Sequence, residues 1–228
     1  MSRRRERSGS SDPAPSPRGT RSSSKEAKPQ LRIKVTSLGS AGTGKSCLIK
    51  RFCESRFVQK CVHPRPVVLF LPDYFHHSRL LPSPPPPHSH RYIATIGVDY
   101  GVKPHTVNGQ QVRVNFWDLS GLPEFFEVRN EFYKDTQGLI LVYDVSDAQT
   151  FDDLDGWVAE AKKFGLKSVP TVVCANKVDL RREVSEQEGR DWAKANGMKY
   201  FETSASTGAN VSEVFESIFN ECVPRGGR

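Results

Sequence analysis

Apolar and polar positions follow two alternating patterns from Leu31 onward. Short apolar runs of the kind found in buried strands alternate with segments whose apolar residues recur every three or four positions, as in amphipathic helices. The runs predict strands at residues 31–38, 112–117, 138–143, 171–175 and 199–202. The helical periods predict helices at residues 45–54, 151–164, 185–195 and 211–222.

This alternation predicts an α/β fold. Strands separated by helices at such spacing join through right-handed crossovers, which give a mostly parallel sheet with helices on both faces. Ligands of such sheets bind at the carboxyl ends of the strands.

Two segments do not fit the alternation. Residues 1–28 are rich in Ser, Arg, Pro and Gly with almost no large apolar side chain, so we expect a disordered basic tail. Residues 61–91 contain eight prolines, four of them consecutive, and a structureless loop of that length is unusual inside a compact domain. We therefore expect one domain at residues 29–223, interrupted by a proline-rich insertion at 61–91 and followed by a short tail at 224–228.

The charge of the chain is concentrated in these two segments. Of the net charge of +7, residues 1–28 supply +5 and residues 61–91 supply +2, so the remainder is neutral. We therefore expect no nucleic-acid partner, and we interpret the basic run at residues 3–5 as a solvated arm. The five cysteines form no pattern of disulfide or zinc-binding spacing, and no apolar run suits a signal peptide or a membrane span, which together favour a cytoplasmic protein.

The most specific motif is Gly-Ser-Ala-Gly-Thr-Gly-Lys-Ser at residues 39–46, between a predicted strand and a predicted helix. Glycines in this phosphate-loop pattern let backbone N–H groups surround a β-phosphate. Lys45 neutralises the β and γ oxygens, and the hydroxyl of Ser46 is a ligand for Mg²⁺.

A second motif, Asn-Lys-Val-Asp at residues 176–179, follows the apolar strand 171–175 and indicates which base is bound. The carboxylate of Asp179 can accept hydrogen bonds from N1–H and the exocyclic amine of guanine. Adenine cannot donate these bonds, so the motif favours guanine over adenine.

Three further motifs follow in order: Thr95-Ile96-Gly97, Asp118-Leu-Ser-Gly121 and Glu202-Thr-Ser-Ala-Ser206. With the two motifs above they make the chain resemble Rab-type small GTPases of the Ras superfamily, and thus a Ras-like P-loop NTPase. The stretch Asn-Glu-Phe-Tyr-Lys-Asp-Thr-Gln at residues 130–137 most resembles the RJL group, Rab-like GTPases that often carry a J domain. No His-Pro-Asp motif of a J domain occurs in this chain.

The resemblance implies a switch that binds GTP or GDP with Mg²⁺. Thr95 would join Ser46 on Mg²⁺ when the γ-phosphate is present, Asp118 would hold the metal through water, and the N–H of Gly121 would contact the γ-phosphate. Lys45, Thr95 and Gly121 are therefore the candidate catalytic residues. The candidate nucleotide-binding residues are Gly39, Ser40, Ala41, Gly42, Thr43, Gly44, Lys45, Ser46, Cys47, Phe57, Thr95, Gly121, Asn176, Lys177, Asp179, Ser204, Ala205 and Ser206. Phe57 is either a lid over the guanine or an ordinary packed aromatic.

The resemblance also implies partners: effectors, exchange factors and activating proteins, bound by a monomer. The C-terminal sequence, which ends a few residues after Cys222, has neither a CaaX box nor paired cysteines. We therefore expect no lipid anchor and at most a peripheral contact with membranes. A nuclear or ciliary association would be an analogy with the RJL group alone.

The chain departs from the family at the residue after Asp-x-x-Gly. The family usually has Gln there to orient the attacking water, whereas this chain has Leu122, whose side chain cannot form hydrogen bonds. We therefore expect slow hydrolysis. The alternative function is a GTP-locked or non-switching scaffold, in which the nucleotide mainly stabilises the fold.

The insertion is the largest departure, since 50 positions separate Lys45 from Thr95 where the family has about 19. We hypothesise that residues 61–91 are a translated intron: the segment corresponds to 93 nucleotides, which preserve the reading frame. The codons of residues 60–62 can supply a GT donor, and those of residues 90–91 an AG acceptor. The alternative is a genuine proline-rich insertion that recruits SH3-like partners.

Overall fold

The computed structural model describes residues 31–55 and 94–224. The predicted tail at residues 1–28, the insertion at residues 61–91, Phe57 and the last four residues lie outside the described residues.

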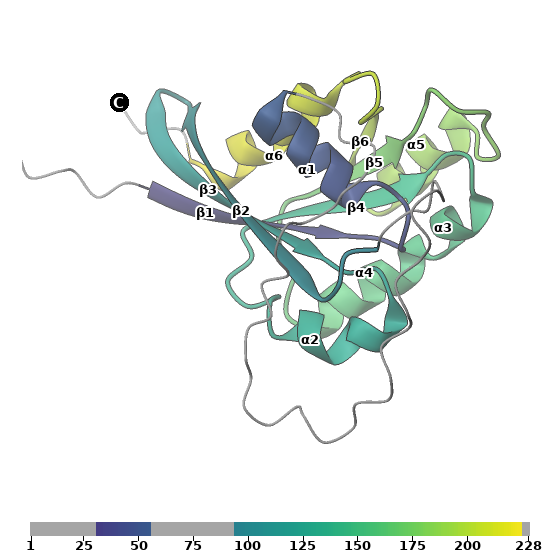
Figure 1. Ribbon diagram of the computed structural model, residues 1–228, viewed down its shortest axis with the longest axis horizontal. Helices are drawn as coiled ribbons and strands as arrows, with labels where there is room; N and C mark the ends of the chain where they lie inside the picture. The colour runs from purple at the N-terminus through teal and green to yellow at the C-terminus, as the bar shows by residue number, and fades with distance from the viewer. Residues whose placement is uncertain (1–30, 56–93, 225–228) are drawn as a thin grey trace, which may run out of the picture.

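A six-stranded sheet forms the centre of the domain (Figure 1). Its strands are β1 (Leu31–Leu38), β2 (Val98–Val107), β3 (Gln110–Leu119), β4 (Gly138–Asp144), β5 (Thr171–Asn176) and β6 (Lys199–Glu202). They lie in the order β2-β3-β1-β4-β5-β6, and only β2 runs antiparallel to its neighbour. The predicted α/β fold with a mostly parallel sheet is confirmed.

Helices cover both faces of this sheet, as Figure 1 shows. Helices α1 (Lys45–Glu54) and α6 (Val211–Cys222) pack on one face, while α3 (Ala148–Asp152) and α4 (Leu154–Lys163) pack on the other. Helix α5 (Glu186–Ala195) packs against β6, and the short helices η2 (Pro123–Phe125) and α2 (Phe126–Asn130) follow β3. Each face has its own hydrophobic core, because successive side chains of a strand point to opposite faces.

Strand β4 illustrates why the sheet is stable. All seven of its residues are buried, so its side chains pack alternately into the two cores. On the α1 and α6 face, the core contains a group of aromatic rings in which Phe215 stacks on Phe52 with 4.4 Å between centroids and meets Phe116 edge-on at 5.5 Å. Burying each such side chain stabilises the fold by about 1.5–3 kcal/mol.

All the predicted elements are present, but the short helices η2 and α2 were not predicted, and strands β3, β4 and β5 extend one or two residues beyond their predicted bounds. Three further differences have identifiable causes. Strand β2 was missed, although the Asn108-Gly109 turn that joins it to β3, with φ of 50° and 76°, is a common hairpin signal. The helix predicted at residues 151–164 is two helices, α3 and α4, because Asp153 ends the first and precedes the second. The helix predicted from residue 185 begins at Glu186, and Ser185 is its N-cap in a capping box with Glu188.

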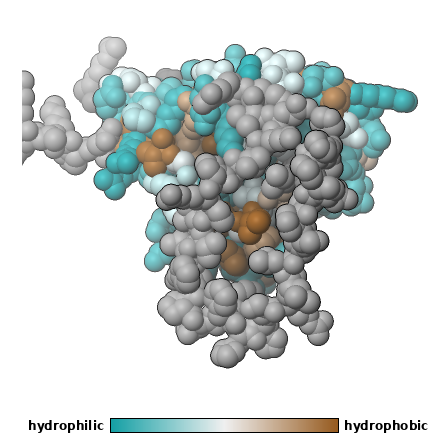
Figure 2. Space-filling model, in the orientation of Figure 1, coloured by the Kyte–Doolittle hydropathy of each residue, from teal (hydrophilic) through white to brown (hydrophobic). Residues whose placement is uncertain are grey.

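The exposed surface of the described residues is mostly hydrophilic in the view of Figure 2, with a few hydrophobic side chains near its middle. Within residues 31–55 and 94–224, the large hydrophobic side chains that remain exposed are Leu31, Ile96, Tyr100 and Leu180. Among the described residues, no helix is both long enough and apolar enough to cross a membrane.

Candidate functional site

The turn between β1 and α1 carries the phosphate-loop motif. Gly39, Gly42 and Gly44 have φ of 138°, 84° and 95°, a region that side chains with a Cβ disfavour. A Cβ on Gly39 would lie 2.1 Å from the carbonyl oxygen of Val142, and one on Gly44 would lie 2.3 Å from the side-chain nitrogen of Asn176. No side chain caps the start of α1, and the N-terminus of a helix favours an anion.

The side chain of Lys45 lies against the backbone of this loop. Its Nζ donates to the carbonyl oxygens of Gly39 at 2.7 Å and Ser40 at 2.9 Å. Burial lowers the pKa of Lys45 to about 8, although the nearby Asp118 opposes this shift. Phosphate oxygens beside the loop would add negative charge and favour the ammonium form.

Three oxygen-bearing side chains from separate elements meet beside the loop. The Oγ of Ser46 lies 2.9 Å from the Oγ1 of Thr95 and donates to Oδ2 of Asp118, and Thr95 Oγ1 lies 3.5 Å from the same Oδ2. Mg²⁺ prefers octahedral oxygen ligands at about 2.0–2.1 Å, which places neighbouring ligand oxygens about 2.9 Å apart. The separation of the two hydroxyl oxygens matches that spacing, so this donor set fits Mg²⁺.

A fourth residue orients this group. Ser37 and Asp118 are paired in register on the neighbouring strands β1 and β3, and Ser37 Oγ donates to Oδ1 of Asp118 at 2.8 Å. Both side chains are buried. The sequence interpretation missed Ser37, whose only signal is a small polar residue near the end of an apolar strand.

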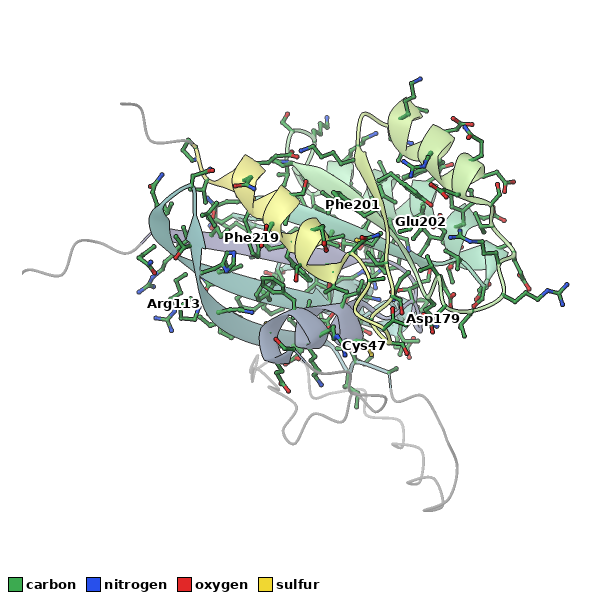
Figure 3. The ribbon with its side chains drawn as sticks, turned by 90° about the horizontal axis from the view of Figure 1, so that it is seen from above. Cys47, Arg113, Asp179, Phe201, Glu202 and Phe219 are labelled. Carbon is green, nitrogen blue, oxygen red and sulfur yellow. The ribbon has the colours of Figure 1, made fainter. Side chains whose placement is uncertain are left out.

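The loop after β5 meets the phosphate loop from the other side. Asn176 donates from Nδ2 to the carbonyl oxygen of Thr43 at 2.7 Å, and its Oδ1 accepts from the backbone N–H of Ala205 at 3.3 Å. Asp179 accepts from the hydroxyl of Ser204 at 2.5 Å, and the exposed Asp179 lies on the same side of the molecule as Cys47 of α1 in Figure 3. Three segments distant in sequence thus form one site.

Lys177 and Ser206 complete this end of the site. Lys177 has a φ of 66°, and its Nζ pairs with Oδ2 of Asp144 at 2.5 Å, so a buried carboxylate holds the lysine beside the loop. Ser206 is exposed. Every residue of the candidate site is therefore described except Phe57, which lies outside the described residues.

Comparison with a family model identifies the family of this chain. The model described as the Ras family matches residues 87–223, which is more than half of the chain. This chain belongs to the Ras family. It is therefore a small GTPase by family, and the predicted Ras-like fold is confirmed.

Relatives of this Ras-family chain agree with the predicted RJL resemblance. DnaJ homolog subfamily C member 27 from Gallus gallus is 45% identical over 206 residues, covering 87% of this chain and 64% of the relative. The proteins of the same name from Danio rerio and Homo sapiens are 46% and 45% identical over 203 and 202 residues, covering 86% of this chain and 63% of each relative. The Ras-family chain thus spans less than two thirds of the length of these relatives.

Within the Ras-family site, Leu122 follows Gly121 at the end of the Asp-Leu-Ser-Gly motif. Its backbone N–H donates to Ser120 Oγ at 3.3 Å, and its carbonyl oxygen accepts from Arg129 Nη1 at 2.9 Å. A Cβ on Gly121 would lie 2.4 Å from the backbone nitrogen of Ala41, so this turn packs directly on the phosphate loop.

Among the described residues, no group of three or more His, Cys, Asp or Glu side chains could hold a metal ion. The candidate metal site depends instead on two hydroxyls and one carboxylate. Mg²⁺ is often held by one or two carboxylates, with waters and substrate phosphates as the other ligands, so such a set is sufficient.

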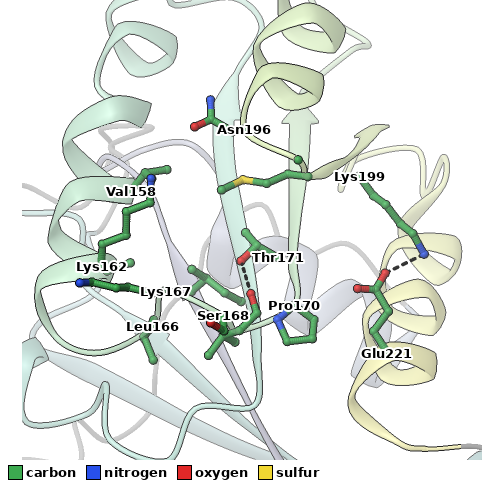
Figure 4. A pocket seen from close by; sticks show the side chains of 15 residues that line it. Val158, Lys162, Leu166, Lys167, Ser168, Pro170, Thr171, Asn196, Lys199 and Glu221 are labelled. Atoms are coloured by element: carbon green, nitrogen blue, oxygen red, sulfur yellow. Dashed lines mark hydrogen bonds and ion pairs between the residues drawn. The ribbon is translucent and has the colours of Figure 1, made fainter.

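A cavity of about 380 Å³ lies away from these motifs. Its lining includes the first residues of β5 and β6, Thr171 and Lys199, whereas the motifs follow the carboxyl ends of strands. Figure 4 shows Lys199 turned to Glu221, with 2.6 Å between the charged atoms. The cavity is therefore distinct from the candidate nucleotide site.

Proposed function

We propose that this chain is a guanine-nucleotide-dependent switch that binds GTP and GDP with Mg²⁺ and hydrolyses GTP slowly. The observation that carries the proposal is the contact between Asn176 and Thr43, at 2.7 Å. This bond joins the loop suited to a guanine base directly to the loop suited to phosphates, so the two loops lie side by side where one nucleotide could contact both.

The proposed phosphate contacts come from the start of α1 and from Lys45. The backbone N–H groups of the first helical turn and the positive end of the helix dipole favour an anion there. The ammonium of Lys45 already lies between two carbonyl oxygens of the loop, so it needs little reorganisation to contact phosphate oxygens.

The proposed metal ligands are Ser46 and Thr95, with Asp118 acting through water. Mg²⁺ bound there would neutralise charge on the β and γ oxygens. Ser37 holds the Asp118 carboxylate in place for this role, because a hydrogen bond to one oxygen leaves the other oxygen directed at Ser46.

The proposed selectivity for guanine depends on Asp179. Its Oδ1 accepts from buried Ser204, which fixes the side chain while its exposed carboxylate can accept donors from the base. At the positions of guanine N1–H and the exocyclic amine of guanine, adenine has no donors, so adenine would leave the charge without these hydrogen bonds.

Slow hydrolysis follows from Leu122. An isobutyl group neither donates to nor accepts from an attacking water, so the chain lacks the usual residue that orients it. The alternative, a GTP-locked scaffold, is favoured by the same residue and differs from the switch in requiring no change between the GDP and GTP states.

Effectors, exchange factors and activating proteins are the proposed partners. Tyr100 on β2, Trp117 on β3 and Phe132 after α2 form a row of rings, with centroids 4.8 Å and 5.0 Å apart. Tyr100 and the neighbouring Ile96 remain exposed. Ile96 follows Thr95 in switch I, and β3 leads into the Gly121 turn at the start of switch II, the segment of residues 120–133. An apolar surface that adjoins both segments suits a protein partner that responds to the nucleotide.

We further propose that the protein is a cytoplasmic monomer. The described cysteines, Cys47, Cys53, Cys174 and Cys222, form no disulfide, which suits a reducing compartment. Imaging of the tagged protein and light scattering of the purified protein would test the location and the monomeric state.

The test is a titration of the purified full-length protein with fluorescent GDP, GTP and ATP analogues in Mg²⁺, followed by single-turnover phosphate release. We expect binding of both guanine nucleotides, at least about 100-fold weaker binding of ATP, and slow phosphate release. The variant Asp179→Asn should lose the preference for guanine, because an amide nitrogen donates where the base needs an acceptor. The matched control is Asp191→Asn on the exposed face of α5.

The same titration with residues 61–91 deleted tests the insertion. Binding by the deleted form alone would mean that the segment inhibits binding or does not belong to the mature protein. If neither form binds guanine nucleotides, the proposed function is wrong.

A further inference from the structure

Arg129 stands out because it is a buried cation that the proposed nucleotide chemistry does not use. It lies in α2, after the Gly121 turn, and is 4% exposed. Its Nε and Nη2 donate to the two carboxylate oxygens of Glu160 on α4 at 2.7 Å and 2.9 Å. Two parallel hydrogen bonds between a guanidinium and a carboxylate hold both groups in a defined orientation and pair their charges.

The remaining nitrogen of Arg129 reaches the Gly121 turn itself. Nη1 donates to the carbonyl oxygen of Leu122 at 2.9 Å and lies 3.5 Å from that of Ser120. These two carbonyl groups flank Gly121. One guanidinium therefore connects the beginning of switch II, its end and helix α4.

Tyr133 supports the carboxylate in this arrangement. Its hydroxyl donates to Oε1 of Glu160, the same oxygen that accepts from Arg129 Nε. Burial raises the pKa of Tyr133 well above its usual range, so the hydroxyl keeps its proton and remains a donor. Glu160 thus has donors on both oxygens, and its charge is compensated despite its partial burial.

Helix α4 also holds the phosphate loop. The Arg129 guanidinium lies 4.7 Å from the centroid of the Trp157 ring, and Trp157 Nε1 donates to Ser40 Oγ at 3.2 Å. Ser40 in turn donates to Asp153 at 2.7 Å. Asp153, Trp157 and Glu160 are spaced four and three residues apart, so they share one face of the helix. That face anchors both loops.

We propose that Arg129 is a positioning residue that holds the Gly121 turn against the phosphate loop from α4, so that switch II keeps one position with GDP and with GTP. The inference rests on the proposed binding of guanine nucleotides. It confines the nucleotide-dependent change of the proposed switch to the segment around Thr95, because the Gly121 turn is held independently of the γ-phosphate.

The contacts that would remain after loss of the γ-phosphate support a fixed Gly121 turn. In the family that this chain belongs to, loss of the γ-phosphate removes the contact with the Gly121 N–H and releases the loop. In this chain the turn would still keep the Arg129 bond to Leu122, which is of the same charge-assisted kind as a bond from an N–H to phosphate. A ligand shifts a conformational equilibrium only by its differential interaction with the two states, so a turn held independently responds little to the γ-phosphate.

The experiment is amide hydrogen exchange of residues 120–133 in the full-length protein, bound to GDP or to a non-hydrolysable GTP analogue. For the wild type we expect exchange rates that agree within about threefold between the two nucleotides. The variant Glu160→Gln keeps the shape of the side chain and removes its charge. With GDP bound, we expect residues 120–133 of this variant to exchange at least about tenfold faster than those of the wild type. With the GTP analogue bound, we expect them to exchange more slowly than with GDP.

Two further variants separate positioning from a general loss of stability. Glu186→Gln removes an equivalent carboxylate from the exposed pair with Arg190 on α5 and should leave exchange at residues 120–133 unchanged. Tyr133→Phe should also speed exchange at residues 120–133 with GDP bound, but by a smaller factor than Glu160→Gln. Exchange in β4 monitors the stability of the whole domain and should not change in any of these variants.

A wild type whose switch II exchanges tenfold or more faster with GDP than with the analogue would overturn the inference, even if Glu160→Gln failed to fold. Equal exchange in the wild type and in Glu160→Gln would also overturn it. In both cases measurable nucleotide binding would leave the proposed function intact. Absence of guanine-nucleotide binding would overturn the proposed function, and this inference with it.

Discussion

Replacing Ser37 by Ala tests the metal site through a residue that would touch neither the metal nor the nucleotide. In the wild type, Ser37 Oγ donates to Oδ1 of Asp118 at 2.8 Å in a buried setting. The substitution removes that donor and leaves the carboxylate with one fewer partner. Because alanine fits wherever serine does on a strand, the backbone of β1 should not change.

The expected size of the effect follows from the chemistry of this bond. A hydrogen bond to a charged acceptor contributes about 1.5–3 kcal/mol. Side chains that orient metal-binding groups typically change metal affinity by about 10–100-fold when they are removed. We therefore expect Mg²⁺ affinity in the presence of GDP to fall by about 10–100-fold, with a drop in melting temperature of several degrees.

The assay measures the release rate of fluorescent GDP as a function of free Mg²⁺. Weaker metal binding should move the Mg²⁺ midpoint of the curve to higher concentration while the release rates at both extremes stay near those of the wild type. The matched control is Thr36→Val on the same strand. It removes a buried hydroxyl whose partner is Thr136, at 2.9 Å, rather than Asp118.

A shift of less than about threefold in the Mg²⁺ midpoint of Ser37→Ala would refute the reasoning, since it would mean that Asp118 is oriented without Ser37. An equal shift in Thr36→Val would refute it in another way. The effect would then come from the general loss of a buried hydroxyl on β1.

Three further changes have expected outcomes. Leu122→Gln should raise single-turnover GTP hydrolysis by at least about tenfold, measured as phosphate release, because the amide can orient water; an unchanged rate would mean that another feature limits hydrolysis. Phe215→Ala removes a buried ring stacked on Phe52 and should lower the free energy of unfolding, measured in urea titrations, by about 3–5 kcal/mol. The control Tyr100→Ala, at an exposed position, should lower it by less than about 1 kcal/mol. Gly39→Ala should abolish nucleotide binding, because its Cβ would lie 2.1 Å from a carbonyl oxygen of β4; binding at wild-type affinity would show that the loop can shift.

The insertion at residues 61–91 calls for a different measurement. Thr95 follows it in sequence, and the structure still places the Thr95 hydroxyl 2.9 Å from that of Ser46. Sequencing of mature transcripts distinguishes the two hypotheses: presence of the segment in most messages would refute the translated intron and favour a genuine insertion.

Much of the fold could be predicted from the sequence, since apolar periodicity depends on which residues face the core. The strands at residues 31–38 and 199–202 and the helices at residues 45–54 and 211–222 have the predicted bounds. Strand β2 was missed because it lies at the edge of the sheet and only Val107 is buried, so its sequence lacks the apolar run of a central strand.

The residues of the candidate site also fall into those that the sequence predicts and those that only the structure reveals. The sequence by itself determined the residues of the phosphate loop and of Asn176–Asp179, because each motif is a short segment whose spacing is set by local backbone geometry and by the ligand it suits. Only the tertiary structure decided which side chains support them. Ser37 meets Asp118 across 81 residues, Arg129 meets Glu160 across 31, and Trp157 meets Ser40 across 117. Such pairs depend on strand register and on the packing of α4, and no local pattern in the sequence specifies a contact between residues that come together only when the sheet and its helices assemble.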